Sequence, residues 1–78
     1  MKIQIRGLTA EVETIIVPGA EPLVDVRAAC GSSVAEHRIV FDDPNAFAMQ
    51  KHLDSIRQQM AEEAVKKEES NLLIGGLQ

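Results

Sequence analysis

The sequence predicts an α+β fold in which a three-stranded antiparallel β-meander packs against one long C-terminal α-helix. Apolar and polar residues alternate through most of residues 2–41, which is the pattern of half-buried strands. Beyond residue 44, apolar residues recur at spacings of three and four, which is the pattern of an amphipathic helix. Glycine and proline separate the alternating segments, so neighbouring strands should be joined by short turns.

The first strand is expected over residues 2–17, with an irregularity at Gly7. Ile3 and Ile5 alternate with polar neighbours, and the phase of the alternation changes after Gly7. A glycine at such a change marks a bulge or bend that resets the register. Two short strands separated at Gly7 satisfy the same pattern, so the sequence leaves both arrangements open.

Two further strands are expected, each preceded by a turn. Residues 17–22 contain two prolines and a glycine, which favour a hairpin loop. Residues 23–30 then alternate as a half-buried strand, and a turn at residues 31–33 leads to a third strand over residues 34–41. On that strand His37 shares a face with the apolar residues, at the margin of the core.

The helix is expected to begin at Asp42, Asp43 and Pro44 and to run to about Glu69. Aspartate caps exposed amides, and proline suits the first helical position because it has no N–H. An apolar stripe follows, formed by Ala46, Met49, Leu53, Ile56 and Met60. This stripe most simply covers one face of the sheet, which would leave the second face open.

Residues 1–70 are expected to form one domain, and residues 71–78 an apolar tail docked on it or on another subunit. A chain of 78 residues buries only about 60% of its unfolded surface, so a partner subunit would help to stabilise it. Part of the stripe and the tail are therefore candidates for self-association as a homodimer: Met49, Leu53, Ile56, Met60, Leu72, Leu73 and Ile74.

Charge and composition exclude several classes of partner. The net charge is −4 and the isoelectric point is near 5.0. The chain contains only two aromatic residues, Phe41 and Phe47. Nucleic-acid binding relies on an excess of Lys and Arg and on aromatic stacking, so no direct binding to nucleic acid is expected. The longest apolar run, Ala46–Met49, is too short to span a membrane.

The sequence gives little support for catalysis, for metal binding or for export. Cys30 is the single cysteine, which indicates a reducing, cytoplasmic setting, and the alternating N-terminus does not resemble a secretion signal. Cys30, His37 and His52 have no metal-ligand spacing. Ser32 and Ser33 are better explained as turn formers than as nucleophiles. We therefore expect no catalytic residue, no metal and no cofactor, and a protein that is not an enzyme.

The function expected from these features is that of a small acidic protein-binding module, an inhibitor or adaptor that blocks a partner protein. Its size also suits a phage or mobile-element product that occupies a basic, nucleic-acid-binding surface of a host defence protein, although no motif indicates this. The residues expected to form the acidic surface are Asp42, Asp43, Glu62, Glu63, Glu68 and Glu69. The alternative is a homo-oligomeric structural or assembly subunit.

Overall fold

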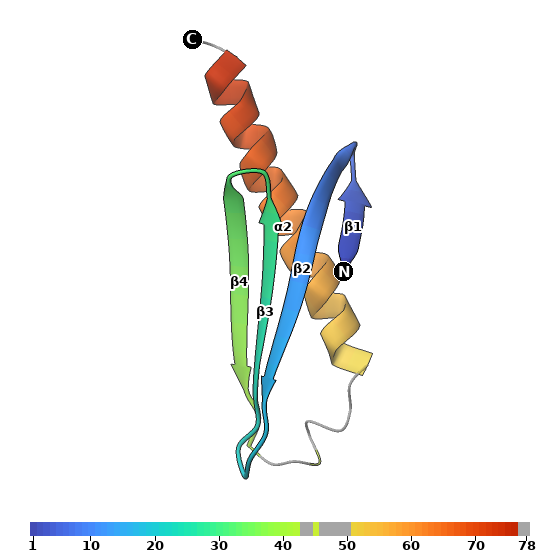
Figure 1. The fold of residues 1–78 in the computed structure, drawn as a ribbon, viewed down its shortest axis with the longest axis vertical. Helices are drawn as coiled ribbons and strands as arrows, with labels where there is room; N and C mark the ends of the chain where they lie inside the picture. The colour runs from blue at the N-terminus through green and yellow to red at the C-terminus, as the bar shows by residue number, and fades with distance from the viewer. Residues whose placement is uncertain (43–44, 46–50, 77–78) are drawn as a thin grey trace.

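The structure is a computed structural model that describes residues 1–42, 45 and 51–76. The described residues form four strands and a long helix: β1 (Lys2–Ile5), β2 (Leu8–Val17), β3 (Leu23–Cys30), β4 (Ser33–Val40) and α2 (Lys51–Gly76). The strands pair antiparallel in the order β1-β2-β3-β4. Helix α2 crosses one face of this sheet diagonally, and its C-terminal end extends past the β3–β4 turn (Figure 1). The predicted α+β architecture, an antiparallel sheet with a C-terminal helix, is confirmed.

The predicted number of strands is wrong, because the segments on either side of Gly7 are separate strands. Ile5 pairs with Leu8, which leaves Arg6 and Gly7 as a two-residue turn between β1 and β2. Both turn residues have positive φ, 49° for Arg6 and 82° for Gly7. This is the conformation of a type I′ turn, whose twist suits a tight hairpin. The phase change at Gly7 therefore marks a chain reversal and not a bulge.

The other turns lie where the sequence indicates them. Residues 18–22 connect β2 to β3, and Cys30 pairs with Ser33 across a second two-residue turn. Its first residue, Gly31, has a φ of 58°. Positive φ at the first central position is the pattern of a type II′ turn, which glycine adopts without steric strain.

Helix α2 ends later than the sequence predicts. The predicted end near Glu69 is wrong, because the helix continues through Gly76. The paired glycines lie in its last turn, a position where glycine commonly ends a helix. The predicted start at Asp43 and Pro44 lies outside the described residues, and Asp42 is an exposed bend residue.

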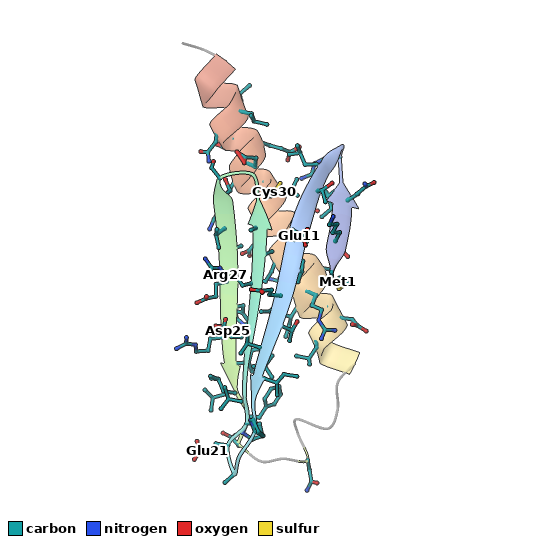
Figure 2. The ribbon with its side chains drawn as sticks, in the orientation of Figure 1. Met1, Glu11, Glu21, Asp25, Arg27 and Cys30 are labelled. Atoms are coloured by element: carbon teal, nitrogen blue, oxygen red, sulfur yellow. The ribbon has the colours of Figure 1, made fainter. Side chains whose placement is uncertain are left out.

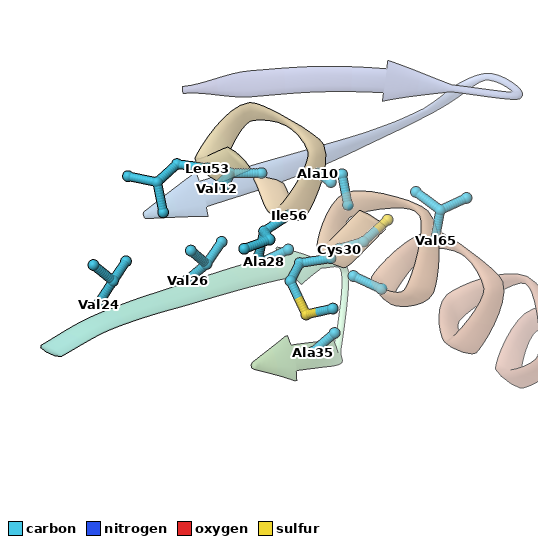
Figure 3. Close-up of a cluster of buried hydrophobic side chains, with 13 residues drawn as sticks. Ala10, Val12, Val24, Val26, Ala28, Cys30, Ala35, Leu53, Ile56 and Val65 are labelled. Carbon is cyan, nitrogen blue, oxygen red and sulfur yellow. The ribbon is translucent and has the colours of Figure 1, made fainter. Parts of the chain in front are cut away.

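The core between sheet and helix is built from small side chains. The largest fully buried ones are Val24, Val26 and Val65. Figure 3 shows Val24 and Val26 pointing from β3 toward the helix, where Leu53 and Ile56 lie. Alanine supplies much of the rest of the core, at Ala10, Ala28, Ala35, Ala61 and Ala64.

The molecule is elongated, as its thin core would suggest. The radius of gyration is 14.6 Å, against about 11–12 Å for a compact domain of this length. The principal extents are 51 × 18 × 14 Å. Within the described residues, no helix has the length and apolar character needed to cross a membrane.

Candidate interaction surface

Glu68 joins the helix to the β3–β4 turn. Its side chain is buried, and its Oε2 accepts a hydrogen bond of 2.7 Å from the backbone N–H of Ser32. The Ser32 hydroxyl lies 3.4 Å from Glu68 Oε1. Three residues further along the helix, the Asn71 amide donates a hydrogen bond of 2.9 Å to Ser33 Oγ. These contacts attach the last turns of α2 to the end of the sheet.

Arg6 joins the helix to the β1–β2 turn at the same end of the sheet. Its guanidinium lies 2.8 Å from Glu69 Oε1 through Nη2 and 2.7 Å from Glu62 Oε1 through Nη1. Hydrogen bonds raise the pKa of Arg6 above its usual value; the bond with Glu69 contributes most and the bond with Glu62 is second. The same hydrogen bond with Arg6 lowers the pKa of the Glu69 carboxyl.

These contacts involve half of the residues expected to form an acidic surface. Glu68 is buried, and Glu62 and Glu69 are paired with Arg6. Asp42 and Glu63 are exposed, and Asp43 lies outside the described residues. An acidic binding surface stays a prediction, and Asp42 and Glu63 are the described residues that offer it the most accessible charge.

The residues expected to mediate self-association are divided between the core and the surface. Leu53, Ile56 and Met60 are buried against the sheet, which is the simpler of the two interpretations of the apolar stripe. Leu72 and Leu73 are exposed at the projecting end of α2. Met49 and the side chain of Ile74 lie outside the described residues. A contact between copies through this set would therefore have to use the end of the helix.

The sheet face opposite α2 carries an apolar cluster at the end where β2 and β3 are connected. Ile15, Val17 and Val40 are 50–57% exposed there, and Leu23 is half-buried beside them. The strand registers bring them together, because Leu23 pairs with Val17 on one side and with Val40 on the other. We call Ile15, Val17, Leu23 and Val40 the open-face patch.

Charged residues of alternating sign border the open-face patch. Asp25 pairs with Ile15 in register, and its Oδ2 lies 3.8 Å from Arg38 Nη2. The other oxygen, Asp25 Oδ1, is buried and has no hydrogen-bond partner among the described residues. Figure 2 shows Asp25 and Arg27 following one another along β3.

A second charged row lies next to this one. Arg27 is flanked in register by Glu13 on β2 and Glu36 on β4. Toward the other end of the open face, a shallow hollow is lined by Glu11, Glu13, Arg27 and Ala29. The open face therefore combines an apolar end with a charged, largely self-compensating middle, beyond which Ala29 pairs with the exposed Val34.

The candidate nucleophiles are Cys30, Ser32 and Ser33, and the contacts of each are explained by a structural role. Cys30 is buried in the core (Figure 3), and desolvation, followed by the charges of Glu68 and Glu69, raises the pKa of its thiol. A buried, protonated thiol is a weak nucleophile. Ser32 bonds Glu68, and Ser33 is buried and accepts from Asn71. Within the described ranges, no group of three or more His, Cys, Asp and Glu side chains could hold a metal ion.

The sequence does not indicate the contacts that hold the two turns. The i,i+7 spacing of Glu62 and Glu69 places both on one side of a helix, but nothing in the sequence indicates that Arg6, far away in the chain, would lie between them.

Comparison with known proteins does not supply a relative: no family model, curated protein or solved structure matches this chain.

Proposed function

We propose that this protein is a non-enzymatic protein-binding module, an inhibitor or adaptor, that contacts its partner through the open face of the sheet. The observation that carries this proposal is the open-face patch. It gathers apolar side chains from β2, β3 and β4 on the side of the sheet that α2 does not cover. Contiguous exposed apolar surface of this kind is typical of interaction sites.

The size of the patch indicates what else the partner must contact. Full burial of a Val, Leu or Ile side chain is worth roughly 1.5–3 kcal/mol, and the four patch residues are already about half-buried, so the patch offers roughly 3–6 kcal/mol. That alone corresponds to only about millimolar affinity. A tighter complex needs the neighbouring charges as well, above all Asp25 and Arg38.

The charge of the chain favours a basic partner. The net charge of −4 attracts a basic protein over distance and speeds the encounter, while the apolar patch stabilises the docked complex. Asp25 Oδ1 is buried beside the patch without a hydrogen-bond partner in the part of the chain that the structure describes, which costs roughly 1–3 kcal/mol.

Affinity capture with paired variants tests the proposal. Ile15→Lys combined with Val17→Lys places two charges in the open-face patch on β2, away from the β4 edge, and both positions are exposed, so the fold should persist. Glu63→Lys on the outer side of α2 is the matched control, because it also introduces lysine at an exposed site. Circular dichroism establishes that each variant is folded before capture from the native host.

The open-face variant should lose the captured protein, and Glu63→Lys should retain it. If Glu63→Lys abolishes capture while the open-face variant binds normally, the acidic helix surface is the binding site and the open face is not. Turnover of a substrate by the purified protein would overturn the non-enzymatic part of the proposal.

A further inference from the structure

Strand β4 is an edge strand, and its hydrogen-bonding pattern shows which of its backbone groups face outward. The N–H of Phe41 donates to Pro22 O at 2.8 Å, so odd-numbered residues of this segment face β3. Lys67 Nζ donates to Val34 O at 3.0 Å, so the Val34 carbonyl faces away from β3. Since backbone groups alternate along a strand, the outward-facing residues are Val34, Glu36, Arg38 and Val40.

This edge is the longest one that the described residues leave open. Strand β4 is eight residues long, whereas β1 at the opposite edge has only four. Two of the β4 edge residues, Val34 and Val40, are exposed valines. Unpaired edges of this length are templates for pairing with another strand. Lys67 does not close the edge, because the Val34 carbonyl has a second lone pair.

The order of residues along β4 selects one symmetric pairing with a second copy. Antiparallel pairing centred on Glu36 would place Glu36 opposite Glu36, and pairing centred on Arg38 would place Arg38 opposite Arg38. Pairing centred on His37 places Glu36 opposite Arg38, and Val34 opposite Val40, in both halves of the contact. Opposite charges across strands stabilise a sheet, and like charges destabilise it.

We infer that the protein forms a homodimer in which the β4 strands of two copies pair antiparallel about His37. This register pairs all the outward-facing residues of β4 and joins the two sheets into one. It closes with two-fold symmetry, so it gives a dimer and not an open filament.

The same register also extends the charged rows of the open face across the dimer. In each copy Asp25 neighbours Arg38, and Glu36 neighbours Arg27, which neighbours Glu13. In the dimer, Arg38 of one copy faces Glu36 of the other. The row across the interface therefore begins with Asp25 and Arg38 of one copy and continues in the second copy with Glu36, Arg27 and Glu13. The signs alternate at every step. This complementarity is the observation that identifies the occupant of the edge as a second copy.

Disulfide trapping tests the dimer and its register together, and it uses the protein alone, so its outcome is separate from partner binding at the open-face patch. In the inferred register, the two His37 residues form a non-hydrogen-bonded pair with Cα atoms about 4.5 Å apart, a spacing that a disulfide can bridge. The two Glu36 residues would be roughly 9 Å apart, beyond the reach of a disulfide, and so would the two Arg38 residues.

The experiment compares His37→Cys with Glu36→Cys and Arg38→Cys under mild oxidation, with the wild type as background control because its Cys30 is buried. His37→Cys should give a covalent dimer at least about tenfold faster than the other two. Reduced wild-type protein should show a concentration-dependent dimer by sedimentation. Faster cross-linking of Glu36→Cys or Arg38→Cys would overturn the register, and a wild type that stays monomeric at millimolar concentration would overturn the dimer.

Discussion

The carboxylate of Glu68 lies where a side chain on Gly31 would begin. A Cβ added to Gly31 would overlap Glu68 Oε2 and lie 2.5 Å from Glu68 Cδ. The carboxylate cannot move aside without cost, because it accepts the hydrogen bond from the Ser32 N–H. Glycine is thus required at position 31 for two reasons, the positive φ of the residue and the close approach of the helix.

Gly31→Ala should destabilise the protein more than Gly7→Ala does. Both glycines have positive φ, and alanine in that region costs roughly 1–2 kcal/mol at either position. A Cβ at Gly7 meets nothing within 4 Å, whereas at Gly31 it displaces Glu68 from Ser32. Loss of that charged hydrogen bond adds roughly 1.5–3 kcal/mol to the free energy change. Urea denaturation of the two variants measures the difference.

A double-mutant cycle identifies the source of the extra loss. In a Glu68→Ala background the carboxylate is gone, so the difference between Gly31→Ala and Gly7→Ala should shrink by roughly 1.5–3 kcal/mol, the contribution of the lost hydrogen bond. An undiminished difference would mean that the Gly31 position depends on something other than Glu68.

Substitutions of Arg6 separate its backbone conformation from its ion pairs. Asparagine adopts positive φ readily and valine does not, while both remove the contacts with Glu62 and Glu69. We therefore expect Arg6→Val to have a melting temperature at least about 4 °C below that of Arg6→Asn. Equal melting temperatures would show that the type I′ turn does not constrain this position.

The Arg6–Glu69 contact should make stability depend on pH in one direction. The folded-state pKa of Glu69 is lowered, so its contribution is complete above the unfolded-state pKa and is lost as pH falls through the folded value. The stability difference between wild type and Glu69→Gln should be constant from pH 7 to about 5 and disappear on further acidification. Denaturation at several pH values measures it, and a difference that grows toward acid would contradict the assignment.

The sequence predicts the regular elements better than their ends. Alternation along residues 23–30 and 34–41 identifies β3 and β4, because one face of each strand is buried and the other is not. Alternation cannot separate a bulge from a turn at Gly7, because that choice depends on the φ of Arg6 and on the pairing of Ile5 with Leu8. The end of α2 also depends on tertiary contacts, such as the Asn71 bond to Ser33.

The candidate surface was only partly predictable for a related reason. The expectation of an uncovered sheet face follows from counting layers, and the structure places Ile15 and Val17 on that face. Charge along the helix predicts an acidic surface, but charge alone does not show that Glu68 is buried or that Glu69 pairs with Arg6. Contacts between residues more than 30 positions apart determine which charges remain available.

The most direct measurement of the central claim is methyl chemical-shift mapping of the protein upon addition of the captured partner. If the open face is the binding surface, the methyl resonances of Ile15, Val17, Leu23 and Val40 should shift or broaden most, and those of Leu72 and Leu73 should remain unchanged. Changes confined to Leu72 and Leu73, with the open-face methyls unaffected, would contradict the claim.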